Sequence, residues 1–196
     1  MANSYKRLIY IVIIVAILSY LFLDKSLALY FLNDPLHLKS LFWIITLYGD
    51  SKYSLISTAI IAIIFFKCSK PIFKGAIYIF SSVALSGILT DIIKVIVARY
   101  RPPMFIKEHL YGFNWFDFGH MVNSFPSGHS TTAFALSVSL AMLFPKYKKI
   151  LLIIATLTAF SRVVVGVHYF SDVLIGSLIG TLTAYYLYKY FYKETI

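Results

Sequence analysis

Hydrophobic positions in this chain form long, nearly uninterrupted runs, separated by short polar or basic segments. A helix rises about 1.5 Å per residue, so roughly 20 apolar residues cross a hydrocarbon layer about 30 Å thick. These runs are too long for the core of a small soluble domain. The pattern predicts an all-α, polytopic membrane protein, residues 1–196 forming one domain, with six transmembrane helices at approximately residues 8–23, 53–66, 72–98, 129–144, 150–167 and 169–192.

The first run, residues 8–23, follows Lys6 and Arg7 and has features of both a signal peptide and a membrane anchor. Ser26-Leu27-Ala28 is a poor cleavage site, and apolar residues resume at Leu27. An uncleaved anchor is therefore the expectation.

Two connections differ from the apolar runs. Residues 24–52 mix apolar and polar types and are interrupted by Asp34-Pro35 and Gly49-Asp50, which predicts an interfacial helix or a re-entrant segment. Residues 99–125 are polar and aromatic and are expected outside the hydrocarbon. Within residues 102–125, six aromatic side chains fit a lid or a lipid-contacting rim, although an interfacial aromatic belt explains any one of them: Phe105, Tyr111, Phe113, Trp115, Phe116 and Phe118.

The composition supports the membrane interpretation. Of 196 residues, 60% are hydrophobic and 13% charged, against about 45–50% and about 25% in a soluble domain. The single cysteine, Cys68, cannot form an intrachain disulfide, and no Cys/His cluster has the spacing of a structural metal site.

The few charges are strongly unbalanced. Lys and Arg number 18 against 8 Asp and Glu, a formal net charge of +10, so a polyanionic partner is worth considering. Nucleic-acid binding normally requires basic residues along a solvated face, whereas here they punctuate hydrophobic runs. Phosphates and anionic lipid remain, and nucleic acid is set aside.

The cations also predict the topology, because short cytoplasmic loops carry a Lys/Arg excess. One side of the membrane receives ten of them: Lys6, Arg7, Lys67, Lys70, Lys74, Lys146, Lys148, Lys149, Lys189 and Lys193. The other side receives six: Lys25, Lys39, Lys52, Arg99, Arg101 and Lys107. The remaining two, Lys94 and Arg162, fall within predicted helices. Both termini are therefore predicted to be cytoplasmic. The 99–125 loop, the start of the fourth helix and the junction of the fifth and sixth helices then face the periplasm or cell exterior.

Three polar clusters map to that outer face. They are Lys94 with Arg101-Pro102, then Pro126-Ser127-Gly128-His129, and finally Ser161-Arg162 with His168 and Asp172. Ionisable residues in membrane helices are expensive to bury and mark candidate functional sites. Three cations that meet at one face need an anion to offset their repulsion, and a phosphate fits.

Each cation also has a simpler interpretation. Lys94 has Asp91 three residues earlier as an ion-pair partner, Arg162 lies near enough to its helix end to snorkel, and Arg101 suits an interfacial anchor. Their convergence is what favours a shared anionic ligand.

Ser127 and Gly128 precede the fourth predicted helix, whose N-terminus favours an anion. Ser127 is expected to act as an N-cap as well. Gly128 is either a turn residue or a position where the backbone approaches a ligand.

His168 and Asp172 are four residues apart. If the sixth helix begins near Gly166, they share one face and the carboxylate reaches an imidazole nitrogen. A fixed tautomer leaves the other nitrogen free to attack or to accept a proton. His129 is a candidate second member of an acid/base pair; spacing alone does not say which histidine attacks.

These residues closely resemble the signature of the type 2 phosphatidic acid phosphatase superfamily. Its three parts match Lys94-x6-Arg101-Pro102, Pro126-Ser127-Gly128-His129 and Ser161-Arg162-x5-His168-x3-Asp172, in order and without a substituted position. The superfamily includes lipid phosphate phosphatases, undecaprenyl pyrophosphate phosphatases, glucose-6-phosphatase and vanadium haloperoxidases. The signature covers residues 94–172, and the six-span pattern extends the resemblance to most of the chain.

The resemblance implies roles for these residues. His168 would be the nucleophile that forms a phosphohistidine, Asp172 would orient it, and His129 would protonate the leaving lipid oxygen and then activate water. The phosphate oxygens would be held, without a metal or other cofactor, by Lys94, Arg101, Ser127, Gly128 and Arg162.

The leading hypothesis is a bacterial inner-membrane lipid phosphatase that acts on the periplasmic side. The bilayer and a lipid phosphate are the expected partners, and no obligate protein partner is inferred. Undecaprenyl pyrophosphate, lipid A phosphate and phosphatidylglycerol phosphate are unranked candidate substrates. Two alternatives stay open: a lipid phosphate transporter or flippase, and a vanadate-dependent haloperoxidase, against which the six predicted spans argue.

Overall fold

The computed structural model describes residues 2–33 and 37–192. Within these ranges the regular structure is helical, and β-pairing is limited to an isolated bridge between Arg99 and Phe113. The all-α prediction is confirmed for this part of the chain. The predicted break at Asp34-Pro35 and the cation Lys193 lie outside the described residues.

The described chain contains long helices joined by short helical turns. The α-helices are α1 (Ala2–Leu18), α2 (Asp24–Leu32), α3 (Lys39–Ile45), α4 (Ser51–Phe65), α5 (Lys70–Val97), α6 (Pro102–Glu108), α7 (Gly128–Leu143), α8 (Lys148–Val164) and α9 (Phe170–Tyr192). A π-helix, Ser19–Leu23, joins α1 to α2, and 3-10 turns cover Thr46–Gly49, His120–Val122 and Pro145–Tyr147. The last five long helices begin and end within three residues of the runs predicted from hydropathy.

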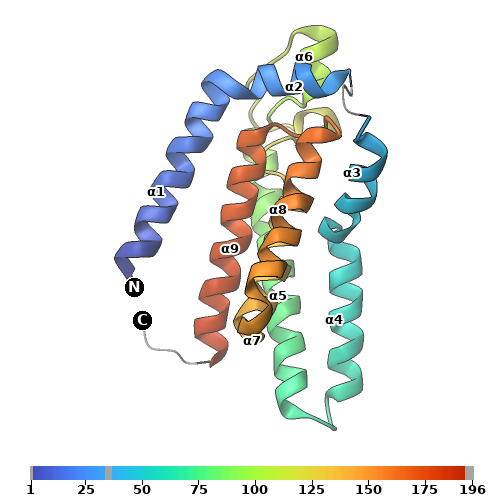
Figure 1. Cartoon of the computed structure of the whole chain (residues 1–196), viewed down its shortest axis with the longest axis vertical. Coiled ribbons are helices and arrows are strands. Elements are labelled where there is room, and N and C mark those ends of the chain that lie inside the picture. Colours follow the sequence, from blue (N-terminus) through green and yellow to red (C-terminus); the bar gives the residue numbers. More distant parts are fainter. Residues whose placement is uncertain (1, 34–36, 193–196) are drawn as a thin grey trace.

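The long helices form an elongated bundle (Figure 1). Helices α4, α5, α7, α8 and α9 run along its length, and α1 lies along one side. Helices α2 and α6 lie across the upper end in the figure, called the α6 end below, and the α4–α5 turn marks the opposite end. Each of the three signature segments lies where a long helix starts or stops at the α6 end.

Three helical stretches are long and apolar enough to cross a membrane: Lys6–Leu32, Lys70–Val97 and Phe170–Tyr192. Helices α4, α7 and α8 contain 15, 16 and 17 residues. At 1.5 Å per residue these reach roughly 22–26 Å, less than a hydrocarbon layer of about 30 Å. The membrane character is therefore supported directly by three stretches rather than by six.

The N-terminal run extends beyond its predicted end at residue 23. Helical structure continues from α1 through the π-helix into α2, which turns across the α6 end (Figure 1). Asp24, the polar residue at which the run was expected to stop, is 1% exposed. It is tolerated there because its carboxylate accepts hydrogen bonds from Ser19, Arg99 and Ser171.

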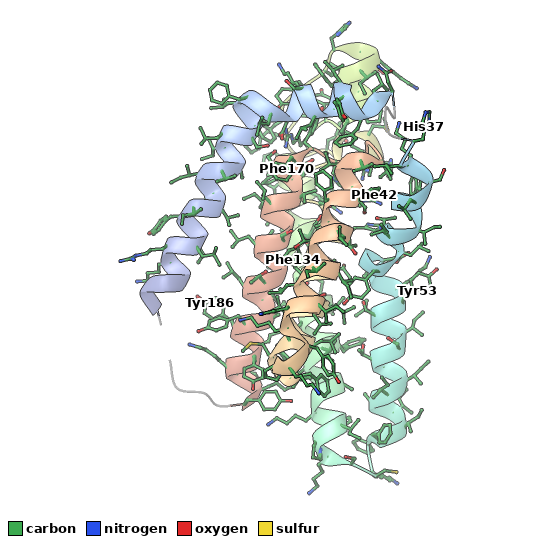
Figure 2. All side chains as sticks on the ribbon, viewed as in Figure 1. His37, Phe42, Tyr53, Phe134, Phe170 and Tyr186 are labelled. Atoms are coloured by element: carbon green, nitrogen blue, oxygen red, sulfur yellow. The ribbon has the colours of Figure 1, made fainter. Side chains whose placement is uncertain are left out.

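The core below the α6 end is built from small and branched side chains. A buried cluster joins Phe31, Ala159, Val163, Val164 and Val173. Figure 2 shows three larger rings packed around it, Phe42, Phe134 and Phe170, whereas Tyr53 and Tyr186 point outward. This cluster ties α2 to the ends of α8 and α9.

Helices α7 and α9 approach each other closely because glycines face the contact. A methyl group at Gly176 would lie 2.5 Å from the Ser127 carbonyl oxygen, and one at Gly180 would meet the Thr131 carbonyl oxygen closer still. Neither backbone has room to shift within a packed helix pair. The start of α7 is therefore held against the first turns of α9.

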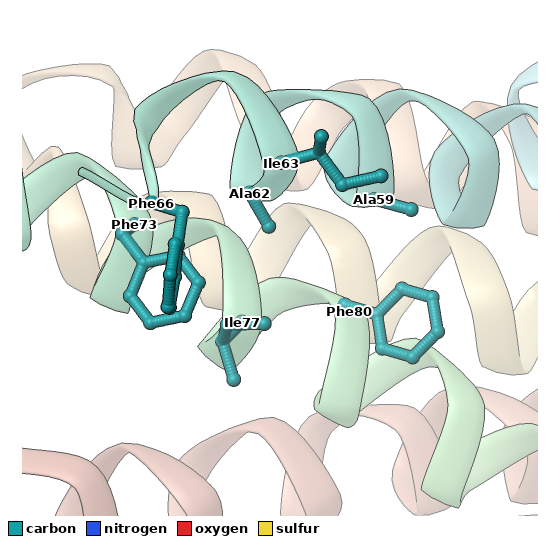
Figure 3. Close-up of a pocket in the computed structure, with 7 residues that line it drawn as sticks. All are labelled: Ala59, Ala62, Ile63, Phe66, Phe73, Ile77 and Phe80. Carbon is teal, nitrogen blue, oxygen red and sulfur yellow. The ribbon is translucent and has the colours of Figure 1, made fainter. Parts of the chain in front are cut away.

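The opposite half of the molecule has a different character. An apolar groove of about 450 Å³ between α4 and α5 is lined by Ala59, Ala62, Ile63, Phe66, Phe73, Ile77 and Phe80 (Figure 3). Its lining contains no ionisable side chain. The polar chemistry is concentrated at the α6 end.

Candidate active site

The structure brings the three signature segments together at the α6 end. Lys94 lies in the last turn of α5, Arg101 immediately precedes α6, and Arg162 lies in the last turn of α8. The Lys94 Nζ lies 3.1 Å from where a Cβ atom at Gly128 would be, next to His129 in the sequence. The backbone N–H of His168 donates to the Arg162 carbonyl oxygen at 3.2 Å, and the backbone N–H of Ser127 donates to the Asp172 carbonyl oxygen at 3.1 Å. Three cations and two histidines thus share one site.

Arg162 is part of the protein interior, so the snorkelling interpretation is wrong. Its residue is 6% exposed, and Nη1 donates to Thr46 Oγ1 at 2.8 Å. Its Nε is buried and has no hydrogen-bond partner in the described structure. A buried guanidinium with an unused donor is costly unless a ligand supplies an acceptor.

Arg101 does more than anchor the chain at an interface. Its Nε donates to the His120 carbonyl oxygen at 2.9 Å, and Nη2 donates to the Asn123 carbonyl oxygen at 3.3 Å. These bonds fasten the far part of the 99–125 connection back onto the start of α6. Burial lowers the pKa of Arg101 from its ordinary value, but an arginine so far above neutrality stays charged.

Lys94 both pairs with Asp91 and lies beside the start of α7, as the two interpretations of its sequence position predicted. Its Nζ lies 3.3 Å from Asp91 Oδ1, the expected ion pair, but Asp91 has a 75% exposed side chain. The same Nζ lies 3.1 Å from where a Cβ atom at Gly128 would be. The glycine therefore leaves room for the ammonium group directly beside the first residue of α7.

Ser127 occupies the N-cap position of α7, but the expected capping bond is absent. Its side chain makes no hydrogen bond to a backbone N–H group of the first turn. Instead, Ser130 Oγ lies 2.9 Å from Ser127 Oγ, and the backbone N–H of Ser127 donates to the Asp172 carbonyl oxygen at 3.1 Å. The Ser127 hydroxyl is thus tied to α7 and its backbone to α9.

The His168 ring is oriented by a backbone carbonyl group. Its Nδ1 lies 2.7 Å from the Ser124 carbonyl oxygen, which can only accept, so Nδ1 carries the proton and donates. The neutral ring then has an unprotonated Nε2, the form needed in a nucleophile or base. The predicted direct bond to Asp172 is not formed, since the carboxylate oxygen is 3.7 Å from Nδ1.

A turn explains why the predicted helical pairing fails. Gly166 has φ +74°, in the left-handed region that ends helices, and α9 begins only at Phe170. His168 therefore precedes the helix rather than sitting one turn before Asp172 on it.

Four residues that hold Asp172 in place, directly or through Arg99, were not identified from the sequence: Ser124, Tyr169, Arg99 and Asp24. Asp172 accepts hydrogen bonds from Ser124 Oγ at 2.6 Å and from the Tyr169 backbone N–H at 2.9 Å, and it pairs with Arg99. Arg99 in turn pairs with Asp24 at 2.8 Å. A charged residue embedded in an apolar stretch was the available signal for Asp24. Arg99 looked like one more outer-loop cation.

The fold and site together define a helical membrane protein with two histidines and three cations gathered at one end of its bundle. The chain belongs to the PAP2 superfamily, whose sequence profile matches residues 75–196. This membership agrees with the resemblance carried by the three-part signature.

Individual relatives and a solved structure extend the comparison. The chain is 39% identical over 103 residues to a lipid A 1-phosphatase of Rhizobium etli, which covers 53% of the chain and 44% of that protein. It is 33% identical over 159 residues to a lipid A 1-phosphatase of Rhizobium johnstonii, which covers 74% of the chain and 65% of that protein. The crystal structure of Aquifex aeolicus LpxE superposes with a TM-score of 0.65 at 27% identity, covering 86% of this chain and 96% of that one.

Proposed function

We propose that this protein is an integral membrane lipid phosphatase, which hydrolyses a phosphate monoester or pyrophosphate of a membrane lipid. One observation carries the proposal: the buried guanidinium of Arg162 has a neutral hydroxyl but no carboxylate partner among the described residues, whereas the buried Arg99 has two carboxylates. A phosphoryl group would supply both the missing acceptor and the missing negative charge. Membership of the PAP2 superfamily supports the same reaction class.

In the first step, Nε2 of His168 attacks phosphorus. The nitrogen–phosphorus bond forms as the bond from phosphorus to the lipid oxygen breaks, giving a phosphohistidine. His129 gives its proton to the departing oxygen. The charge that develops on the phosphoryl oxygens is stabilised by Lys94, Arg101 and Arg162, together with Ser127 and the backbone at Gly128.

In the second step, His129 accepts a proton from a water molecule that attacks phosphorus. The nitrogen–phosphorus bond breaks, inorganic phosphate leaves, and His168 returns to its neutral form. The proposal needs no metal ion, because the three cations provide the positive charge around the phosphoryl group. Asp172 acts on His168 through Ser124. The Asp172 carboxylate accepts a hydrogen bond from the Ser124 hydroxyl, and the Ser124 carbonyl oxygen accepts one from His168 Nδ1.

The proposed topology keeps residues 1–196 as one domain with six spans and places both termini in the cytoplasm. The start of α1, the α4–α5 turn, the α7–α8 turn and the end of α9 carry most of the cations and lie away from the α6 end. The positive-inside rule then favours a periplasmic site in a bacterial inner membrane. The short helices α4, α7 and α8 would span with local thinning of the bilayer.

Among the candidate substrates, a lipid A phosphate is favoured by similarity to the two rhizobial lipid A 1-phosphatases. Undecaprenyl pyrophosphate and phosphatidylglycerol phosphate are the competing substrates. All three present a phosphate at the membrane interface, where the α6 end would lie.

Release of inorganic phosphate from detergent-solubilised protein tests the proposal. The three lipids are compared side by side with EDTA present, and lipid A phosphate is expected to turn over fastest. His168→Asn is expected to remove turnover of every lipid. The matched control is His109→Asn, at an exposed loop histidine with φ +59° that asparagine tolerates.

The outcomes separate the competing functions. Failure to release phosphate from any lipid would refute a phosphatase and favour a lipid carrier. Full activity in His168→Asn would refute the assignment of the nucleophile alone. Loss of turnover in EDTA that added metal restores would refute the metal-independent mechanism.

A further inference from the structure

A second charged cluster shares Asp172 with the catalytic residues, and its other two charged members, Asp24 and Arg99, have no role in the proposed phosphate chemistry. Arg99 is buried between two buried carboxylates: Nη1 pairs with Asp172 and Nη2 with Asp24. All three residues are at most 1% exposed. Ser171 joins the same cluster, since it accepts a hydrogen bond from Arg99 and donates to Asp24.

Four aromatic rings surround the Arg99 guanidinium. Its Cζ lies 4.3 Å from the ring centre of Tyr169, 4.9 Å from that of Tyr20, 5.3 Å from that of Tyr111 and 5.8 Å from that of Phe113. The Tyr111 hydroxyl accepts from Arg99 and donates to the Tyr20 carbonyl oxygen at 2.6 Å. These contacts hold the guanidinium plane in one orientation.

The electrostatics make Arg99 a fixed cation. Burial alone lowers the pKa of Arg99, but the Asp172 and Asp24 carboxylates outweigh this and raise the pKa above its ordinary value. Arg99 differs here from Arg162, which has no carboxylate partner among the described residues. One arginine is already neutralised by the protein, and the other is left for a ligand.

The Asp24 end of this cluster depends on the π-helix at Ser19–Leu23. Its wider turn ends immediately before Asp24, and Ser19 Oγ donates to Asp24 Oδ1 at 2.7 Å. The Ser171 backbone N–H, in the first turn of α9, donates to the same oxygen at 3.1 Å. Such local widening of a helix is common at functional sites.

The cluster is linked to the reactive ring through Asp172. Its second oxygen accepts from Ser124 Oγ, and the carbonyl oxygen of Ser124 holds Nδ1 of His168. A continuous chain of contacts therefore runs from Asp24 through Arg99, Asp172 and Ser124 to His168. Asp24 lies outside residues 75–196, the part matched by the family profile.

We infer that Asp24 and Arg99 are positioning residues for the His168 nucleophile, an inference that rests on the proposed phosphatase function. Arg99 divides its two Nη groups between two carboxylates. This restrains the Asp172 carboxylate in the orientation that binds Ser124. The first helix of the protein thereby takes part in holding the nucleophile, although no atom of Asp24 or Arg99 needs to touch the phosphate.

Asp24→Asn tests this inference with a side chain of nearly unchanged size. Without the second carboxylate, the guanidinium is drawn toward Asp172 and the Ser124 contact weakens. A fall in kcat of about 10- to 100-fold is expected, with KM changed less than about twofold, because misplacement of a reacting group acts on the chemical step. Glu108→Gln, at an exposed carboxylate near the same end, is the matched control and should behave as wild type.

A second variant is needed because Asp24→Asn alone removes one of the two carboxylates that pair with the buried Arg99 and could prevent folding. Asp24→Asn combined with Arg99→Gln removes one negative and one positive charge together, so the net charge of the cluster stays the same. This double variant is expected to fold and to retain the low kcat. If either folded variant keeps wild-type kcat and KM, the cluster only stabilises the fold and the inference is overturned.

A readout independent of turnover completes the test. ¹⁵N NMR of the histidine rings, with His168 assigned by comparison with His168→Asn, shows which ring nitrogen carries the proton. Wild type should show one tautomer protonated at Nδ1, and Asp24→Asn a mixture. Identical His168 signals in the two proteins would overturn the inference, whether or not the wild type releases phosphate. Absence of phosphate release from the wild type would instead refute the proposed function.

Discussion

The bond between Thr46 and Arg162 offers a direct test of how the site is assembled. Thr46 lies in the turn between α3 and α4, 2% exposed, and its hydroxyl accepts from Arg162 Nη1 at 2.8 Å. Thr46→Val replaces the hydroxyl with a methyl group of similar size. The change therefore removes an acceptor from a buried cation without opening a cavity.

The expected magnitude follows from the charge on the donor. Hydrogen bonds to charged groups contribute about 1.5–3 kcal/mol, and about 1.4 kcal/mol corresponds to tenfold in rate. If Arg162 stabilises the transferring phosphoryl group, Thr46→Val should lower kcat/KM by about 10- to 150-fold. Thr46→Ser keeps the hydroxyl and should restore most of the activity.

Phosphate release from the lipid substrate is the assay, with thermal unfolding in detergent as a check on folding. The matched control is Thr156→Val, at an exposed position of α8 where the hydroxyl bonds only the preceding turn of its own helix. A folded Thr46→Val protein with unchanged kcat/KM would refute the view that Arg162 needs this support.

Three further changes test the packing and the connection around the site. Gly180→Ala should lower the free energy of unfolding, measured by calorimetry, by about 1–3 kcal/mol or prevent folding, since the methyl group meets the α7 backbone. The control Gly87→Ala, at a position with open space around it, should leave the free energy of unfolding unchanged or raise it. Tyr78→Phe removes the buried bond to the Ala184 carbonyl oxygen and should lower Tm by about 2–4 °C; an unchanged Tm would contradict that contact. Arg101→Lys should speed limited proteolysis within residues 102–125, because it loses the bonds to two carbonyl oxygens of that connection; an unchanged cleavage rate would argue against this.

Hydropathy predicted most of the helical frame but not its N-terminal part. The five later runs were located well because most of their ends are marked by basic or proline-containing turns, and the junction of the last two is marked by Gly166. The first run was ended too early because Asp24 was taken as a boundary. A carboxylate can continue a helix when distant residues pair with it, and Arg99 and Ser171 are 75 and 147 positions away in the sequence. Pairing over such distances leaves no periodic signal.

The signature identified the candidate side chains at the site but not how they are held. Spacing predicted that Asp172 bonds His168 directly, because four residues equal about one helical turn. The left-handed turn at Gly166 delays the start of α9, and the Ser124 carbonyl oxygen, 44 positions earlier, takes the ring proton instead. A backbone acceptor can belong to any residue type, so its identity could not be predicted from side-chain pattern.

The buried arginines show why net charge alone does not locate a substrate site. Arg99 and Arg162 are both buried at the α6 end, although from the sequence only Arg162 was assigned to the phosphate and Arg99 was counted among the outer-side cations. Arg99 is bound by two carboxylates, so an added anion there would compete with Asp24 and Asp172. The Nε of each arginine is buried without a hydrogen-bond partner in the described structure, so the difference lies in the carboxylates: the side chain of Arg162 is bound only by the neutral hydroxyl of Thr46. In the proposed mechanism, the acidic partners rather than the cations therefore decide which basic residues are available to a phosphoryl group. Like Arg162, Lys94 and Arg101 lack a buried carboxylate partner among the described residues, which is why these three cations are the ones assigned to the phosphate.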